Sequence, residues 1–162
     1  INETALPASS ASLLRGIVCG GYSPAHVNII EFVTIATAGN AQDFGDMTGI
    51  NTGSAGSSDS TRGVITVGYT GPNSMLDRID FITIQSAGNA TDFGDLTLAR
   101  YLSANMSNSI RAVIAGGGSP SATNTIDFVT IKTTGNASDF GDLIGGANFV
   151  VVGTSDSHGG LS

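Results

Sequence analysis

One block of residues occurs three times in this chain and limits its fold more than any other feature. Each copy begins as a strand-like run of the type Ile-Asp-Phe-Val-Thr-Ile and continues into Gly-Asn-Ala-x-Asp-Phe-Gly-Asp. A fixed internal period indicates one supersecondary unit stacked on copies of itself, because a single unit cannot bury its apolar face alone. The copies lie at residues 30–46, 79–95 and 126–142.

An arginine opens an apolar run ahead of each block and sets the period of the repeat. Successive arginines lie 47 and 49 residues apart, and the aspartates of the Asp-Phe-Gly triplets lie 49 and 47 residues apart. We interpret residues 1–162 as a single repeat domain, with His158 where a fourth arginine would stand. Because the ends add partial repeats, we expect either a longer array or a protomer whose end pairs with a neighbour. The arginines are Arg15, Arg62 and Arg111; the repeats are about 15–61, 62–110 and 111–157, and the partial repeats are 1–14 and 158–162.

The composition favours strands over helices. The chain has 23 Gly, no Trp and few helix-forming residues, and no segment shows an amphipathic helical pattern. In each repeat we expect a strand after the arginine, a strand at Ile-Asp-Phe-Val-Thr-Ile and a shorter strand from the second Phe. The weakly patterned remainder, such as 97–109, could hold a fourth, outer strand. The prediction is an all-β fold.

The aromatic and basic residues of the repeat are predicted to be structural. Six of the seven Phe occupy two repeated positions, which favours a role in the core. Each repeat arginine could pair with a repeat carboxylate of an adjoining unit. Cys19 is expected to be a small core residue. The repeated Phe are Phe32, Phe81 and Phe128, then Phe44, Phe93 and Phe140.

The paired aspartates of Asp-Phe-Gly-Asp are the candidate ligands for a metal ion. With neighbouring carbonyls and Asn they could bind Ca²⁺. The alternative is that one Asp caps backbone N–H groups while the other faces water or a repeat arginine. We predict no metal and no cofactor. The Ca²⁺ candidates are Asp43, Asp46, Asp92, Asp95, Asp139 and Asp142.

Charge and symmetry argue against several classes of function. The net charge is −7 with six Lys and Arg, which is unfavourable for nucleic-acid binding. No stretch approaches the roughly 20 apolar residues of a membrane-spanning helix. A catalytic site needs unlike groups around one substrate, whereas the polar residues here mostly obey the repeat. His26 and His158 are the only histidines and suggest no base–nucleophile pair. We therefore predict that the protein is not an enzyme.

The repeat resembles the kelch repeat of β-propellers, in which a diglycine ends one strand and two aromatic residues follow. Gly20-Gly21 and Gly116-Gly117 match the diglycine, while the middle repeat departs from it with Gly68-Tyr69. The resemblance implies kelch-like propeller blades; a pseudo-threefold β-prism or β-trefoil is the alternative. Because a propeller has about four to eight blades, three repeats would need further copies or more chain to close a ring.

Residues 15–143 also resemble the repeats of structural and tail-associated proteins of tailed bacteriophages, especially marine cyanophages. The strand Asp-Phe-Ile-Thr-Ile followed by Gly-Asn-Ala-x-Asp-Phe-Gly-Asp-Leu-Thr-x-x-Arg, at 80–100, carries the resemblance. It implies a virion protein of the tail fibre, tail or capsid surface that contacts itself, other virion proteins or the host surface. It implies no enzymatic activity.

Two other functions remain open from the sequence. The first is a carbohydrate-binding, lectin-like module that recognises a host surface glycan, for which Tyr22, Tyr69 and Tyr101 are the only tyrosines available for stacking. The second is a hydrolase built on a propeller, for which the sequence offers no asymmetric acid–base cluster.

Overall fold

The computed structural model describes residues 7–22, 24–71, 74–119, 121–147 and 153, and the statements below concern these residues. All fourteen regular elements in them are β-strands. Twelve of the strands form three four-stranded antiparallel sheets, which confirms the all-β prediction. The sheets stay separate and close no barrel within the described residues. No helix that could cross a membrane occurs in this part of the chain.

The three sheets follow one another along the chain. Sheet 1 contains β1 (Ala8–Ala11), β2 (Arg15–Tyr22), β3 (His26–Thr34) and β4 (Gln42–Asn51), in that order. Sheet 2 contains β5 (Ala55–Ser58), β6 (Arg62–Thr66), β7 (Arg78–Thr83) and β8 (Thr91–Asp95). Sheet 3 contains β9 (Ala104–Ser107), β10 (Arg111–Ala115), β13 (Thr125–Thr130) and β14 (Ser138–Asp142). Between β10 and β13 in the chain, β11 (Gly118–Ser119) and β12 (Ser121–Ala122) form a small hairpin.

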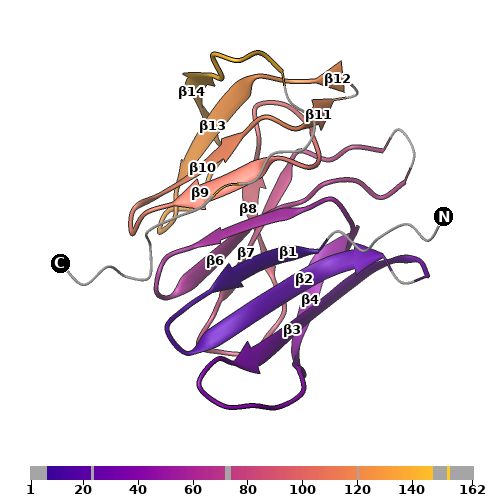
Figure 1. Ribbon diagram of the computed structural model, residues 1–162, viewed down its shortest axis with the longest axis vertical. Helices are drawn as coiled ribbons and strands as arrows, with labels where there is room; N and C mark the ends of the chain where they lie inside the picture. The colour runs from indigo at the N-terminus through magenta and orange to yellow at the C-terminus, as the bar shows by residue number, and fades with distance from the viewer. Residues whose placement is uncertain (1–6, 23, 72–73, 120, 148–152, 154–162) are drawn as a thin grey trace.

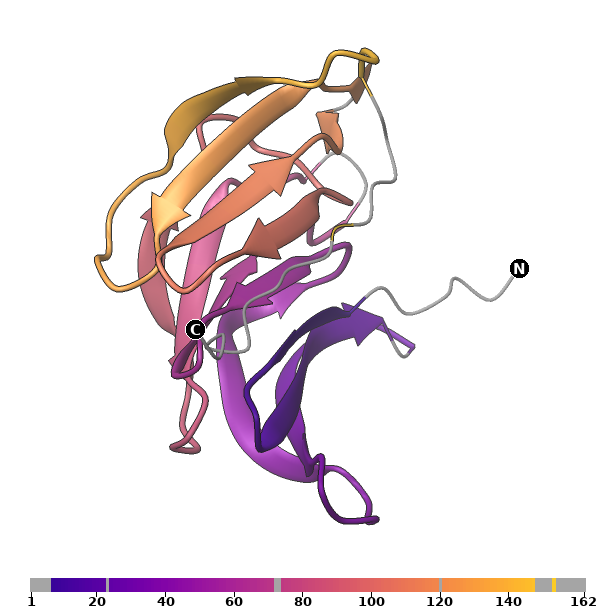
Figure 2. The ribbon, with the colours of Figure 1, turned by 60° about the vertical axis from the view of Figure 1, so that its left-hand side comes forward.

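The sheets are stacked face to face along the long axis of the molecule, with sheet 1 at the bottom of Figure 1 and sheet 3 at the top. Figure 2 shows that they fan apart around one edge. At that edge β1 packs beside β5, and β5 packs beside β9. Each sheet contains one copy of the repeated block, on its third and fourth strands.

The expected fourth strand exists, but its predicted place was wrong. The segment 97–109 does contain a strand, β9, yet β9 pairs with β10 and so opens the next sheet instead of closing the previous one. Each sheet accordingly begins seven residues before its arginine. The first strand of each sheet lies at the edge where neighbouring sheets meet, and the strand that contains the second Phe forms the opposite edge.

A β-bulge explains the Asp-Phe-Gly triplet. In sheet 2, Ile79 pairs with Gly94 and Asp80 pairs with Asp92, so Phe93 is an extra residue in β8. A bulge of this kind re-aims one side chain, and Phe93 is 2% exposed. The same shift occurs in sheets 1 and 3, next to Phe44 and Phe140.

The core consists of two apolar layers, one between each pair of neighbouring sheets. The layer between sheets 1 and 2 contains Ile17, Ile30 and Phe44 of sheet 1 against Ile65 and Ile82 of sheet 2. The layer between sheets 2 and 3 places Val64, Ile79, Phe93 and Leu96 against Ala112, Ile114, Val129 and Ile131. Burial of this apolar area is the main force that holds the sheets together.

Candidate functional site

The repeated block forms the joints between sheets. We call the contact of sheets 1 and 2 joint 1, and that of sheets 2 and 3 joint 2. In joint 1 the Gly88 N–H donates to the Phe44 carbonyl at 2.7 Å, and the Ala90 N–H donates to the Asp46 carbonyl at 2.7 Å. The Asp46 N–H in turn donates to Oδ1 of Asn89 at 3.0 Å. Joint 2 repeats all three bonds. The Gly135 N–H donates to the Phe93 carbonyl at 2.8 Å, and the Ala137 N–H donates to the Asp95 carbonyl at 2.7 Å. The Asp95 N–H donates to Oδ1 of Asn136 at 3.1 Å.

The glycine of each Asp-Phe-Gly triplet is required by the close approach of the next sheet. A Cβ on Gly45 would lie 2.6 Å from the backbone carbon of Gly88, and one on Gly94 would lie 2.5 Å from that of Gly135. Both glycines also have positive φ, +143° and +145°. The triplet is therefore a docking surface for the Gly-Asn-Ala of the following repeat.

A buried carboxylate lies inside each joint. Asp80 and Asp127, the acidic residues of the Ile-Asp-Phe strands, are fully buried. The Thr48 hydroxyl donates to Oδ1 of Asp80 at 2.8 Å, and the Thr48 N–H donates to Oδ2 at 3.1 Å. In joint 2 the Thr97 hydroxyl and N–H donate to Asp127 at 2.6 Å and 3.1 Å. Each threonine belongs to the sheet that precedes its aspartate, so these bonds also link neighbouring sheets.

Each buried carboxylate has an arginine partner. In joint 1, Nε of Arg78 lies 3.2 Å from Oδ1 of Asp80. In joint 2, Nη1 of Arg100 lies 3.0 Å from Oδ2 of Asp127, and both side chains are fully buried. Burial raises the pKa of Asp80 above its ordinary value, although Thr48 and Arg78 act against it. Burial also lowers the pKa of the Arg100 guanidinium, although Asp127 acts against it.

The repeat arginines have a different role from the one predicted. In the described residues Arg15, Arg62 and Arg111 form no ion pair; each stacks over the first Phe of its own sheet, at 4.6, 4.3 and 4.8 Å from the ring centre. Arg15 also donates to the Ile84 carbonyl at 2.9 Å, and Arg62 to the Ile131 carbonyl at 2.9 Å. The carbonyl lies on the next sheet, so the arginine crosses the joint without a carboxylate.

The repeated Phe form one aromatic pair in each sheet. The rings meet edge to face, a favourable geometry for aromatic pairs. Their positions agree with the predicted structural role, except that Phe140 is 54% exposed whereas Phe44 and Phe93 are 2% exposed. The centre distances are 6.0 Å for Phe32–Phe44, 6.0 Å for Phe81–Phe93 and 5.9 Å for Phe128–Phe140.

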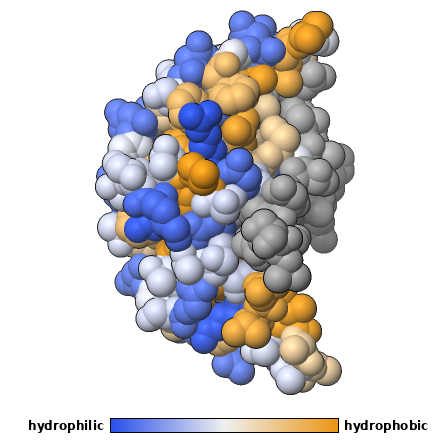
Figure 3. Space-filling view, turned by 90° about the vertical axis from the view of Figure 1, so that its left-hand side faces the viewer, coloured by the Kyte–Doolittle hydropathy of each residue, from blue (hydrophilic) through white to orange (hydrophobic). Residues whose placement is uncertain are grey.

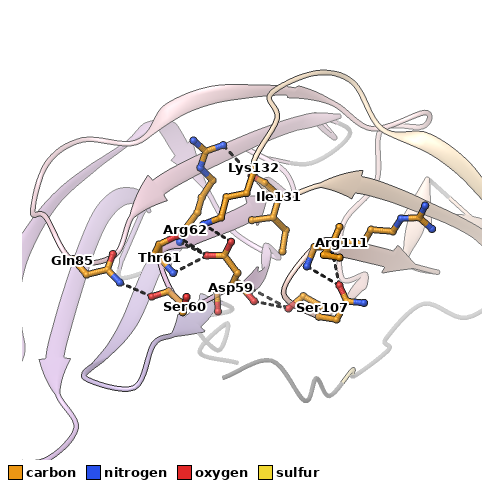
Figure 4. Close-up of polar contacts among 12 residues, drawn as sticks. Asp59, Ser60, Thr61, Arg62, Gln85, Ser107, Arg111, Ile131 and Lys132 are labelled. Carbon is orange, nitrogen blue, oxygen red and sulfur yellow. Dashed lines mark hydrogen bonds and ion pairs between the residues drawn. The ribbon is translucent and has the colours of Figure 1, made fainter. Parts of the chain in front are cut away.

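Joint 2 has a further polar cluster around Asp59, in the turn between β5 and β6 (Figure 4). Its carboxylate accepts from the N–H groups of Thr61 and Arg62, both at 2.7 Å. Nζ of Lys132, from sheet 3, lies 2.6 Å from Asp59 Oδ2 and also contacts the Thr61 hydroxyl. Burial acts to raise the pKa of Asp59, but Lys132 and the backbone N–H groups outweigh it and hold this pKa below its ordinary value.

The six Ca²⁺ candidates lie apart from these buried groups. All six aspartate side chains are exposed, and within the described part of the chain no group of three or more His, Cys, Asp or Glu could hold a metal ion. Asp139 accepts from the Gly141 N–H at 3.2 Å, as the alternative of a capping aspartate predicts for one member of a pair. Asp46 and Asp95 take part in the joints through their backbone.

The tyrosines come together with a histidine at one end of the strands. Tyr22 and His26 lie 5.3 Å apart, His26 and Tyr69 lie 5.7 Å apart, and Tyr69 and Tyr101 lie 5.1 Å apart, each measured between ring centres. We call these four residues the aromatic row. Each is half-buried. Tyr22 and His26 belong to sheet 1, Tyr69 lies between β6 and β7, and Tyr101 lies between β8 and β9. His158 lies outside the described residues.

Cys19 is a core residue, as predicted. Its side chain is fully buried between sheets 1 and 2. Burial, with a smaller contribution from Asp80, raises the pKa of the Cys19 thiol to about 12. The thiolate that would act as a nucleophile is therefore scarce at neutral pH.

Sequence reasoning missed the Thr–Asp–Arg contacts of the joints. The repeated spacing of Thr48 and Thr97 after the Asp-Phe-Gly triplet carried the signal. So did the two arginines outside the repeated positions, Arg78 and Arg100. What the sequence could not provide was the rule that the threonine of one repeat faces the aspartate of the next.

Comparison with known proteins supports the fold alone. No family model matches the chain, and no curated protein matches it. Among solved structures, the chain is similar to the one titled "Structure of YjhT", with a TM-score of 0.71 and 7% sequence identity. The match covers 88% of this chain and 53% of that chain, so the described array spans about half of the structure it resembles.

Proposed function

We propose that this chain is a non-enzymatic structural protein of a bacteriophage virion, built from kelch-like propeller blades. The observation that carries the proposal is the use of the repeated block. Its Gly, Ala, Phe and Asp backbone groups, its Asn side chain, and the buried aspartates and threonines around them are engaged in joints between sheets. A motif used to attach one repeat to the next is the motif of a building unit, in line with the resemblance to phage tail and structural repeats.

The arrangement of the sheets supports the propeller part of the proposal. Propeller blades are four-stranded antiparallel sheets that pack around a common axis. Here each sheet has four antiparallel strands, and the first strands β1, β5 and β9 lie side by side. The fold similarity to a solved structure about twice as long is compatible with a larger array of the same kind.

Quantitative mass spectrometry of purified particles tests the virion assignment. Virions of the phage that encodes the chain are banded by density, and peptides from residues 79–95 are measured against a known capsid protein and a non-structural phage protein. The proposal expects a fixed copy number per particle through every purification step. Depletion in parallel with the non-structural protein would refute it.

The aromatic row favours a second function, binding of a host surface glycan. Half-exposed aromatic rings on one face are the groups on which sugar rings stack, and Tyr22, Tyr69 and Tyr101 all lie in this row. The chain has three Tyr and no Trp, so its tyrosine emission comes entirely from the row. A glycan that binds there should change this emission, and Tyr69→Ala should abolish the change. Glycan-array binding that survives Tyr69→Ala would place the glycan elsewhere.

A further inference from the structure

No described sheet packs on either of the two outer faces of the array, although each face carries the groups that a joint uses. We call the face of sheet 1 that points away from sheet 2 the leading face, and the face of sheet 3 that points away from sheet 2 the trailing face. Apolar residues are exposed near both ends of the long axis (Figure 3). The two faces are thus the two complementary halves of a joint.

The trailing face presents the acceptor half of a joint. Phe140 is 54% exposed, whereas Phe44 and Phe93 at the same position are 2% exposed. A Cβ on Gly141 would meet nothing within 4 Å, although the same atom on Gly45 or Gly94 would collide with the next sheet. Arg111 is exposed and stacks on Phe128 as the other repeat arginines stack on their Phe. No described sheet follows sheet 3 to offer Arg111 a carbonyl acceptor.

The leading face presents the complementary half. Ile35 is 57% exposed, whereas Ile84 and Ile131 at the same position are fully buried. Val33 is 39% exposed, whereas its equivalents Ile82 and Val129 are 2% and 4% exposed. Gly39, Asn40 and Ala41, the equivalents of the docking residues in joints 1 and 2, are all exposed, and a Cβ on Gly39 would meet nothing within 4 Å.

We propose that the leading face of one copy of this chain binds the trailing face of a second copy, so that two chains close a ring of six sheets. By the pattern of joints 1 and 2, Gly39 and Ala41 would donate to the carbonyls of Phe140 and Asp142. Asn40 would accept from the Asp142 N–H, and Arg111 would donate to the Ile35 carbonyl. Each joint pairs two different faces, and the closed dimer contains this joint twice, related by a two-fold axis.

Two copies are the number that the geometry favours. Propellers contain about four to eight blades, which six sheets satisfy and nine would exceed. The match that covers 53% of the YjhT chain also leaves room for about one more array of this size. This inference rests on the propeller arrangement proposed above and is independent of the virion assignment.

The third joint differs from the other two in the side chains around the buried carboxylate. Ile29 stands where joint 1 has Arg78, and Ala147 stands where joint 2 has Arg100, so the third joint has no arginine partner. Glu31 stands where joints 1 and 2 have Asp80 and Asp127, and Ile144, which is fully exposed, stands where they have Thr48 and Thr97. The threonine hydroxyl bond is therefore lost, while the Ile144 N–H and the longer Glu31 carboxylate can still meet. The joint between copies should be weaker than the joints within a chain.

Light scattering after size exclusion tests the proposal with the 162-residue chain. The expected mass is twice the 16.2 kDa of one chain. Ile35→Asp and Phe140→Asp should each give the monomer mass, whereas Ile50→Asp, which changes an isoleucine that is 48% exposed on β4, should leave the dimer intact. Asn40→Ala, at an exposed loop position, should weaken the dimer about tenfold without changing the fold. A monomeric wild-type protein over the whole accessible concentration range would overturn the proposal.

Mixing the two monomeric variants tests the head-to-tail arrangement. A mixed dimer contains one intact joint, formed by the leading face of Phe140→Asp and the trailing face of Ile35→Asp. We therefore expect dimers to reappear in the mixture, with circular dichroism showing that both variants keep the β-fold. If Phe140→Asp alone stays dimeric, or if the mixture stays monomeric although both variants are folded, the two faces do not bind each other. Particle mass spectrometry reports on the virion assignment separately.

Discussion

Joints 1 and 2 share their backbone contacts but differ in the side chains that neutralise the buried aspartate. Arg78 comes from the same strand as Asp80, and its side chain is 26% exposed. Arg100 comes from the segment between sheets 2 and 3, and its side chain, like that of Asp127, is 0% exposed. The carboxylate has the same position in both joints, whereas its arginine does not. A buried carboxylate needs a partner, but the repeat can supply that partner from more than one position.

The exchange is visible in the sequence once the sheets are superimposed by position. Asn51 occupies the place of Arg100 in the first repeat, and Thr125 occupies the place of Arg78 in the third. The ion pair of Asp59 and Lys132 in joint 2 has no counterpart in joint 1, where Ser12 and Gln85 stand at the same positions. The hydrogen bonds of Gly-Asn-Ala, by contrast, are the same in both joints.

The largest difference between the joints is expected from Arg100→Leu. This change leaves Asp127 buried with only Thr97 as a donor, and removal of one partner of a buried ion pair costs about 3–5 kcal/mol. Urea unfolding of each variant in the monomeric Phe140→Asp background measures the free energy of unfolding without a contribution from assembly. Arg111→Leu, at an exposed arginine, is the matched control and should cost far less.

A second variant separates the charge from the packing. In the Arg100→Leu background, Asp127→Asn replaces the unpaired carboxylate with a neutral acceptor for Thr97 and should restore part of the lost free energy. If the double variant is less stable than Arg100→Leu alone, the cost of the single change comes from lost packing of the arginine, and the comparison of the joints by charge is wrong.

The apolar part of the joints should respond equally. Phe44→Ala and Phe93→Ala each remove a ring that is 2% exposed, and each should cost about 3–5 kcal/mol. The measurement is again the free energy of unfolding in urea. A difference between the two variants as large as that between the arginine variants would show that the joints differ in packing as well as in charge.

The sequence predicted the features that lie within one repeat and missed the contacts between neighbouring repeats. The period, the all-β fold, the structural role of the Phe pairs and the buried Cys19 follow from local pattern and composition. The place of β9 did not, because a four-residue strand with no regular apolar pattern, Ala-Asn-Met-Ser at 104–107, gives no sign of which sheet it joins. The threonine partners of Asp80 and Asp127 were missed because they lie 32 and 30 residues away, in the preceding repeat. The repeat arginines were predicted to pair with carboxylates because of their charge. Instead each stacks on a Phe ring, and Arg15 and Arg62 also donate to a carbonyl of the next repeat.

Arg78→Leu should have a smaller effect than Arg100→Leu. Arg78 is partly exposed, and Asp80 keeps both donors of Thr48, so the loss is that of one hydrogen bond to a charged group, about 1.5–3 kcal/mol. Urea unfolding under the same conditions gives the comparison. An effect equal to or larger than that of Arg100→Leu would mean that exposure does not set the difference between the two joints.

The smallest effect is expected from Lys132→Gln, which gives sheet 3 the residue that sheet 2 has at Gln85. Lys132 is 55% exposed, so its ion pair with Asp59 should contribute at most about 1 kcal/mol. An unperturbed Asp has a pKa of about 3.9, and the pKa of Asp59 in the folded protein is held below its ordinary value. The stabilisation by the ion pair is therefore fully present above the ordinary pKa and is lost as the pH falls through the lower folded-state pKa. The stability difference between wild type and Lys132→Gln should therefore be largest near neutral pH and shrink in acid.

Asp80, whose pKa is raised, changes stability in the opposite direction, but it is present in both proteins and cancels in the difference. Urea unfolding at a series of pH values measures this difference, and one that stays constant or grows in acid would show that Lys132 acts on joint 2 through something other than the charge of Asp59.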